Sequence, residues 1–67
     1  MSDLYTQATK TVNAYVELFD GDMKEVRRQV LLDVDFLFRE GTDGARFYAL
    51  TLDYAYHMLV EQTKEAE

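Results

Sequence analysis

The first segment with a regular hydrophobic pattern runs from residue 3 to residue 20. Its apolar positions recur every three or four residues, and at 100° per residue they fall within about 120° of arc. Polar residues such as Lys10 and Glu17 lie on the opposite side. Ser2 or Asp3 can accept hydrogen bonds from the free amides at the start of the segment. The pattern predicts a helix over about residues 3–20 with one apolar face. That face comprises Leu4, Tyr5, Ala8, Val12, Tyr15, Val16 and Phe19.

A glycine turn separates this segment from the second. Gly21 can adopt the left-handed conformation that ends a helix. Asp22, followed three residues later by Glu25, is a variant of the capping box that starts one. We therefore expect the second helix at about residues 23–40. Its main apolar arc comprises Met23, Val26, Val30, Leu31, Val34, Leu37 and Phe38.

The third helix follows a second turn of the same kind. Gly41 comes after the second helix, and Thr42 or Asp43 can cap the next, so this helix is expected at about residues 44–64. Three helices joined by short turns predict an all-α, single-domain protein over residues 1–67. It is either a three-helix bundle or an open three-helix array that dimerises. The main face of the third helix comprises Ala45, Tyr48, Ala49, Leu52, Ala55, Tyr56, Leu59 and Val60.

The second and third helices also carry apolar residues outside their main faces. Soluble monomers seldom expose a contiguous apolar patch this large, and Tyr, Phe and Met are enriched in interface cores. We expect these residues to form an interface with a second copy of the chain and with a larger protein. The alternative interpretation is a tightly wrapped bundle in which two helices each bury more than one face. The surplus residues are Leu32, Phe36, Phe47, Leu50, Tyr54 and Met58.

The small size of the chain favours the interface interpretation. The core of a chain this short provides only about 3–5 kcal/mol of stability. The 67 residues include no cysteine and one histidine, so neither a disulfide nor a multi-histidine zinc site within the chain can add to it. Oligomerisation or a partner is the remaining source of stability.

The formal net charge of −6 argues against direct binding to nucleic acid, because that affinity comes from Lys and Arg neutralising phosphates. Lys24, Arg27 and Arg28 nevertheless follow a glycine turn, as in the recognition helix of a helix-turn-helix protein, and are the alternative nucleic-acid contact. The acidic residues on the same helix favour ion pairs on a solvated surface instead. Acidic mimicry of a nucleic acid is the other alternative of this class.

Candidate chemistry is sparse. Asp53, His57 and Glu61 recur every four residues, but three ligands from one helix rarely converge on one ion, so a solvated polar stripe is the preferred interpretation. Asp33 and Asp35 point about 200° apart on a helix and do not share a site. We therefore assign no catalytic residue, metal ligand or cofactor, and expect that the chain is not an enzyme.

These patterns favour a small helical regulator or inhibitor of a larger protein. A short reading frame with its own start Met suits the accessory proteins of bacteriophages and mobile elements, including inhibitors of host enzymes or defence complexes. The sequence predicts no transmembrane span and no signal peptide, so we expect a cytoplasmic protein with no membrane partner.

Overall fold

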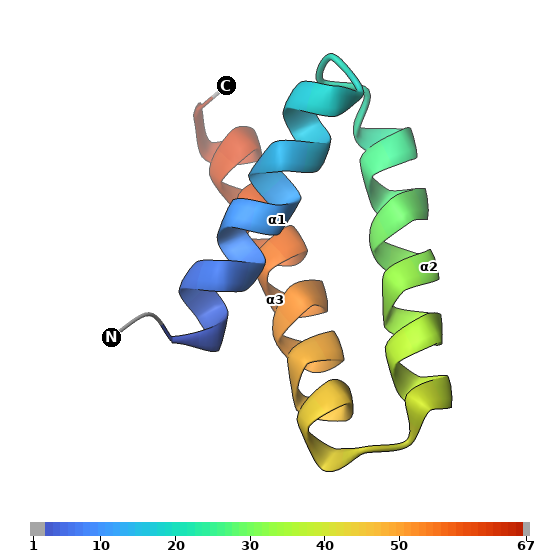
Figure 1. Cartoon of the computed structure of the whole chain (residues 1–67). Coiled ribbons are helices and arrows are strands. Elements are labelled where there is room, and N and C mark those ends of the chain that lie inside the picture. Colours follow the sequence, from blue (N-terminus) through green and yellow to red (C-terminus); the bar gives the residue numbers. More distant parts are fainter. Residues whose placement is uncertain (1–2, 67) are drawn as a thin grey trace.

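The computed structural model describes residues 3–66 and folds them into three helices (Figure 1). They are α1 (Leu4–Leu18), α2 (Met23–Glu40) and α3 (Asp43–Ala66). The predicted all-α class and three helices are confirmed, and no helix boundary lies more than two residues from its predicted position. In residues 3–66, no helix is long and apolar enough to cross a bilayer.

Helix α3 holds the molecule together because it packs against both other helices. Helix α2 runs antiparallel to α3, whereas α1 crosses in front of α3 (Figure 1). Helices α1 and α2 meet at their connecting turn and diverge away from it, so they touch each other least. Where α1 and α2 diverge, side chains of all three helices line a recess.

The turn between α1 and α2 uses two left-handed residues. Gly21 is left-handed, as predicted, with a φ of 81°. Asp20 before it is left-handed as well, with a φ of 52°. The Gly21 amide donates to the carbonyl of Val16 over 2.8 Å, which closes the end of the helix. The chain therefore leaves α1 at Leu18, two residues before the predicted end.

Capping side chains start the helices close to the predicted positions. Asp3 accepts a hydrogen bond from the Thr6 amide over 2.7 Å, and this bond holds the pKa of Asp3 below its ordinary value. The alternative cap, Ser2, lies outside the described residues. Gly41 is left-handed after α2, with a φ of 78°, and Thr42 accepts from the Ala45 amide over 3.1 Å. Helix α3 consequently begins one residue before its predicted start.

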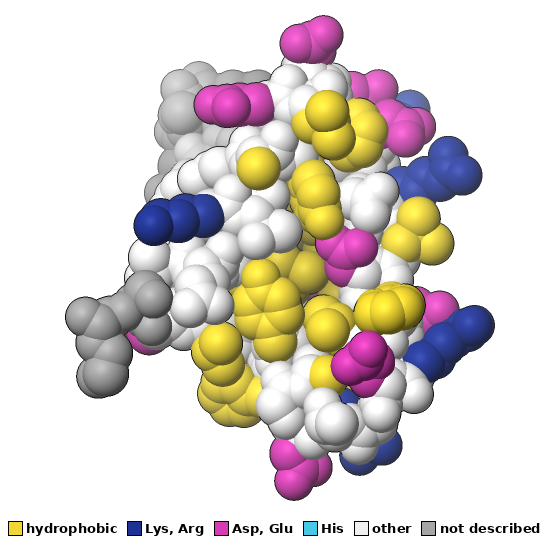
Figure 2. Space-filling model, in the orientation of Figure 1, with side chains coloured by type: hydrophobic (Ala, Val, Ile, Leu, Met, Phe, Trp, Pro, Cys, Tyr) yellow, Lys and Arg dark blue, Asp and Glu magenta, His cyan; other side chains and the backbone are white. Residues whose placement is uncertain are grey.

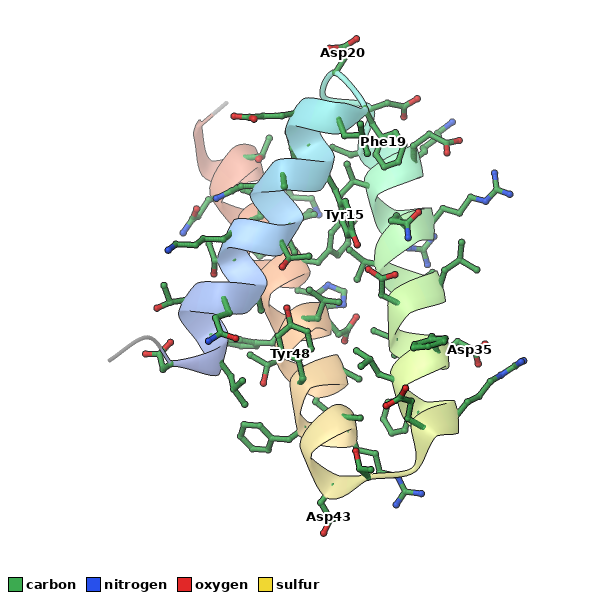
Figure 3. The ribbon with its side chains drawn as sticks, viewed as in Figure 1. Tyr15, Phe19, Asp20, Asp35, Asp43 and Tyr48 are labelled. Atoms are coloured by element: carbon green, nitrogen blue, oxygen red, sulfur yellow. The ribbon has the colours of Figure 1, made fainter. Side chains whose placement is uncertain are left out.

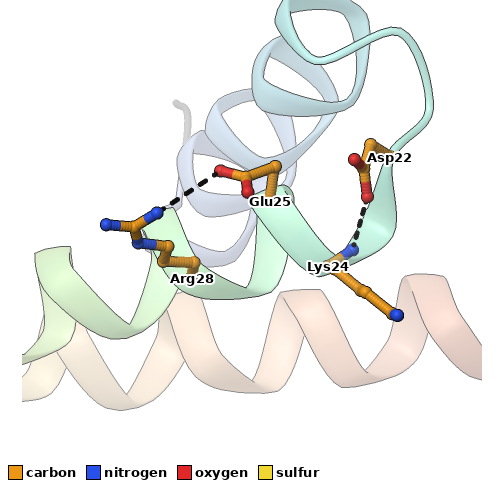
Figure 4. A network of polar contacts seen from close by, with 4 residues as sticks. All are labelled: Asp22, Lys24, Glu25 and Arg28. Atoms are coloured by element: carbon orange, nitrogen blue, oxygen red, sulfur yellow. Dashed lines mark hydrogen bonds and ion pairs between the residues drawn. The ribbon is translucent and has the colours of Figure 1, made fainter.

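At the start of α2, Asp22 caps the helix as predicted, but the reciprocal bonds of a capping box with Glu25 are not observed. The carboxylate of Asp22 accepts from the Lys24 amide over 3.2 Å (Figure 4). The Asp22 amide, however, donates to the carbonyl of Phe19 over 3.0 Å and does not need the side chain of Glu25. Glu25 instead lies 4.0 Å from Arg28, one turn further along the helix.

The core is small. Its largest fully buried side chains are Leu52, Val12, Val26 and Val30, which come from all three helices. No fully buried side chain in the described residues is larger than leucine, and alanines fill much of the rest. Hydrophobic stabilisation follows the apolar area removed from water, so this core supports only a marginally stable single chain.

Candidate interaction surface

Large hydrophobic side chains remain exposed on all three helices. Five of the six predicted interface residues are among them, with exposed fractions between 55% and 63%. These five are therefore not part of the core of the single chain. On the face shown in Figure 2, hydrophobic side chains form a band over the space between α1 and α2, with acidic side chains beside it. The five are Leu32, Phe36, Phe47, Leu50 and Tyr54.

Three of the four predicted interface residues of α3, Phe47, Leu50 and Tyr54, gather around one groove, which we call the α1–α3 groove. It has a volume of about 530 Å³. The rings of Tyr5 and Tyr54 meet across it with centroids 5.7 Å apart and planes tilted by 54°. Of the described residues that line it, Asp3 alone carries a charge. The groove is lined by Asp3, Leu4, Tyr5, Phe47, Leu50, Thr51 and Tyr54.

Leu4 and Tyr5 are interface candidates that the sequence analysis missed. Their spacing assigns them to the apolar face of the first helix, and the residues further along that face, Ala8 and Val12, are indeed buried. Because α1 crosses α3 at an angle, its first turn extends beyond the core and leaves both side chains more than one third exposed. Helical periodicity gives the face of a residue but not the length over which a neighbouring helix covers it.

A second recess, the three-helix hollow, lies where α1 and α2 diverge over α3. Its volume is about 240 Å³. Tyr15 and Tyr48 both lie in this region between the helices (Figure 3). The predicted interface residue Phe36 is part of this hollow and not of the α1–α3 groove. The hollow is lined by Thr11, Tyr15, Asp33, Phe36, Leu37, Tyr48 and Leu52.

Polar groups inside the three-helix hollow are connected by hydrogen bonds. The Tyr15 hydroxyl donates to Oδ2 of Asp33, and Gln29 donates to Oδ1 of the same carboxylate over 3.0 Å. The hydroxyls of Thr11 and Tyr48 lie 3.2 Å apart. Burial, followed by the hydrogen bond and charge of Asp33, raises the pKa of Tyr15 to about 12. Tyr15 is therefore a neutral hydrogen-bond donor at neutral pH.

Leu32 lies on the outer side of α2, among the alternative nucleic-acid contacts. A hollow of about 370 Å³ on this side is lined by Leu32 and by the three basic residues. Acidic residues accompany the bases on this helix: Arg28 lies 4.0 Å from Glu25, and Arg39 lies 3.1 Å from Asp35. The lining residues are Lys24, Arg27, Arg28, Leu31, Leu32 and Asp35.

Met58 is separated from the other predicted interface residues of α3. It is half-buried and lines a recess of about 90 Å³ between α1 and α3, together with Val12 and Leu59. The structure thus brings Phe47, Leu50 and Tyr54 together and places the other three predicted residues in three different surroundings.

The polar stripe on α3 is solvated. His57 Nε2 lies 3.5 Å from Asp53 Oδ1, and Glu61 is exposed one turn further along. Among the side chains that the structure describes, those of residues 3–64, no three His, Cys, Asp or Glu are grouped so that they could hold a metal ion.

Two of these recesses differ clearly in character. The α1–α3 groove is almost entirely apolar, whereas the three-helix hollow combines apolar walls with a carboxylate and three hydroxyls. Comparison of the chain with family models, with curated proteins and with solved structures finds no match.

Proposed function

We propose that the chain is a small protein–protein interaction module that regulates or blocks a larger protein, and that it acts as a homodimer joined through the α1–α3 groove. The observation that carries this proposal is the gathering of five large hydrophobic side chains around one groove with a single charged residue in its lining. A contiguous apolar surface of this kind on a soluble protein marks an interaction site.

A second copy of the chain is the occupant that the charges favour. Two copies with a net charge of −6 repel each other, so they associate best where charge is sparse. The α1–α3 groove and the three-helix hollow each contain one carboxylate, but Asp3 of the groove is exposed, whereas Asp33 of the hollow is half-buried. The outer side of α2 contains both signs of charge, so the groove meets the requirement best. In a two-fold dimer each copy presents the same patch, so the apolar side chains of one groove cover those of the other.

The small core gives self-association an energetic reason. Burial of apolar surface contributes roughly 25 cal/mol per Å², and the exposed aromatic and leucine side chains of the groove are available for it. Phe47 and Leu50 each have an exposed fraction of 61%. When a second copy covers Phe47 and Leu50, their burial adds to the stability of the core. The fully buried side chains of that core are Leu52, Val12, Val26 and Val30.

The role that we propose towards the larger protein is binding without catalysis. A short chain can block a partner by covering the few residues that dominate an interface. Catalysis instead requires a pocket whose reactive groups are held by surrounding residues, and such a supporting shell is difficult to build in a chain of 67 residues.

The proposal is tested by measuring the solution mass by light scattering over a concentration series. We expect wild-type protein to approach twice the 7.8 kDa of the chain, while Leu50→Asp and Phe47→Asp remain monomeric with unchanged helical circular dichroism. A buried unpaired charge is costly in an interface but harmless in water. Leu18→Asp is the matched control, because Leu18 is 70% exposed and lines none of the recesses described above, and it should dimerise like wild type. A wild-type monomer at every concentration, or dimers of Leu50→Asp as stable as those of wild type, would contradict the proposal.

A further inference from the structure

The three-helix hollow is left without a role by the dimer, and its chemistry differs from that of the groove. We infer that it binds an arginine side chain of the larger partner protein, with the guanidinium paired to the carboxylate of Asp33 and lying against the aromatic rings of the hollow. The inference rests on the proposed function, because it specifies how the module recognises that partner.

The volume of the hollow suits a single amino-acid side chain better than a small-molecule ligand. Pockets for small molecules typically measure about 300–1,000 Å³. The hollow, at about 240 Å³, is smaller. A long, slender side chain that enters from a partner's surface fits this volume.

The charge of the hollow selects a cation. Asp33 is the one charged residue among the described residues that line it. An ionised carboxylate offers about four acceptor positions on its two oxygens. One bond from Tyr15 and one from Gln29 leave acceptor capacity on each oxygen, which is what a two-pronged guanidinium contact requires.

No basic group in the described part of the chain neutralises Asp33. Among the described side chains of residues 3–64, the contacts of 4.0 Å or less between basic and acidic groups join Arg28 to Glu25, Arg39 to Asp35 and His57 to Asp53. Asp33 takes part in none of them, although its two neighbouring hydrogen-bond donors hold the carboxylate in position. A half-buried carboxylate without a cation gains from one supplied by a partner.

The aromatic walls favour arginine over lysine. Phe36 and Tyr48 both line the hollow. A guanidinium is planar, stacks on aromatic faces and is more weakly hydrated than an ammonium ion, so it loses less on leaving water. The net charge of −6 also speeds the encounter with a basic partner surface.

The test is a titration of isotope-labelled protein with N-acetyl-arginine amide, followed by NMR. We expect binding on the order of millimolar, as befits a ligand of this size, with the largest shifts at residues around the hollow. The lysine analogue should bind several-fold more weakly, and the norleucine analogue should not bind.

Asp33→Asn should weaken arginine binding at least tenfold, since it removes a charge-assisted hydrogen-bond pair. Asp35→Asn is the matched control: it removes the same charge two residues away on α2, and it should bind like wild type. Phe36→Leu keeps the charge but removes a ring, and should weaken binding several-fold without affecting the fold. Equal binding by Asp33→Asn and Asp35→Asn, or by the arginine and lysine analogues, would overturn the inference.

The outcome is separable from that of the dimer. The same titration of the Leu50→Asp monomer should still show binding of the arginine analogue in preference to the lysine analogue, because Leu50 is not part of the hollow. If Asp33→Asn abolished the dimer, a second copy and not a foreign protein would fill the hollow, and the inference would be wrong. If wild type binds the arginine analogue but is monomeric at every concentration, the dimer proposal is wrong and the inference about the hollow is supported.

Discussion

The hydroxyl of Tyr15 on α1 donates a hydrogen bond to the carboxylate of Asp33 on α2 and so joins the two helices that touch each other least. Burial of the phenol, together with this bond and the negative charge of Asp33, raises the pKa of Tyr15 from its ordinary value of 10.0 to about 12. The folded protein therefore favours the neutral phenol more than the unfolded chain does.

This relationship makes the stability of the protein depend on alkaline pH. The contribution of Tyr15 is fully present below pH 10, and it is lost as the pH rises from about 10 to about 12, where the folded protein must ionise the phenol. We expect a loss on the order of 1 kcal/mol, because solvent screens this partly exposed pair. Urea unfolding at several pH values should show the loss in wild type but not in Tyr15→Phe.

The tyrosinate absorbance offers a direct measurement of the same group. The part of the absorbance that disappears in Tyr15→Phe should titrate with a midpoint at about 12. Asp33→Asn should lower this midpoint without restoring 10.0, because burial is the largest cause of the raised pKa and remains. If the absorbance that is lost in Tyr15→Phe instead titrates at about pH 10 in wild type, the hydrogen-bonded pair of Tyr15 and Asp33 does not form in solution.

Salt should strengthen the proposed dimer. Each copy has a net charge of −6, and the groove through which we propose that they associate contains little charge, so salt should screen repulsion and remove almost no attraction. We expect the dissociation constant to fall several-fold between about 20 mM and 500 mM salt, measured by analytical ultracentrifugation. Dissociation on adding salt would indicate that ion pairs hold the copies together.

Leu52→Ala should unfold most of the protein. Leu52 on α3 is 1% exposed, and removing a buried leucine side chain costs about 2–5 kcal/mol, comparable to the whole stability of a core this small. Leu18→Ala removes the same atoms from an exposed position and should change the free energy of unfolding by less than about 0.5 kcal/mol. Thermal melts followed by circular dichroism measure both. Similar melting of the two variants would contradict the assigned core.

Two glycines should respond in opposite directions to alanine. Gly41 has a φ of 78°, so a side chain there is strained, and Gly41→Ala should lower stability by roughly 1 kcal/mol. Gly44 lies inside α3 with no positive φ and open space around its Cβ position, so Gly44→Ala should raise stability by about 0.5–1 kcal/mol. Chemical denaturation compares the two directly. The same sign for both would show that the second turn is not formed as described.

Local features of the fold could be predicted from the sequence because they depend on neighbours in the chain. The spacing of apolar residues gave three helices, and Asp22 and Gly41 lie at a helix start and a helix end as expected. Leu31 and Phe38 show the limit of the method. Periodicity assigns both to the main apolar face of α2, yet they are 47% and 41% exposed. Both lie at the edge of that face that is turned away from the α1-facing Asp33, and Leu31 lines the outer hollow with Arg28 and Leu32.

The candidate site was predictable only in part, for the same reason. Phe47, Leu50 and Tyr54 share one stripe of one helix, so their gathering follows from spacing alone. The contact between Tyr15 and Asp33 joins positions 18 residues apart on two helices. It depends on the crossing angle and on the register of α1 against α2, which no local pattern specifies.

Helix α1 forms a wall of both recesses: Leu4 and Tyr5 border the groove, while Thr11 and Tyr15 border the hollow. Detachment of this single helix from α3 would dismantle both at once. If the two recesses are occupied as we propose, either ligand would stabilise the attached helix, so each should raise the affinity for the other through thermodynamic linkage. A chain of 67 residues would in this way couple its own assembly to the capture of its partner without any second conformation of the remaining two helices.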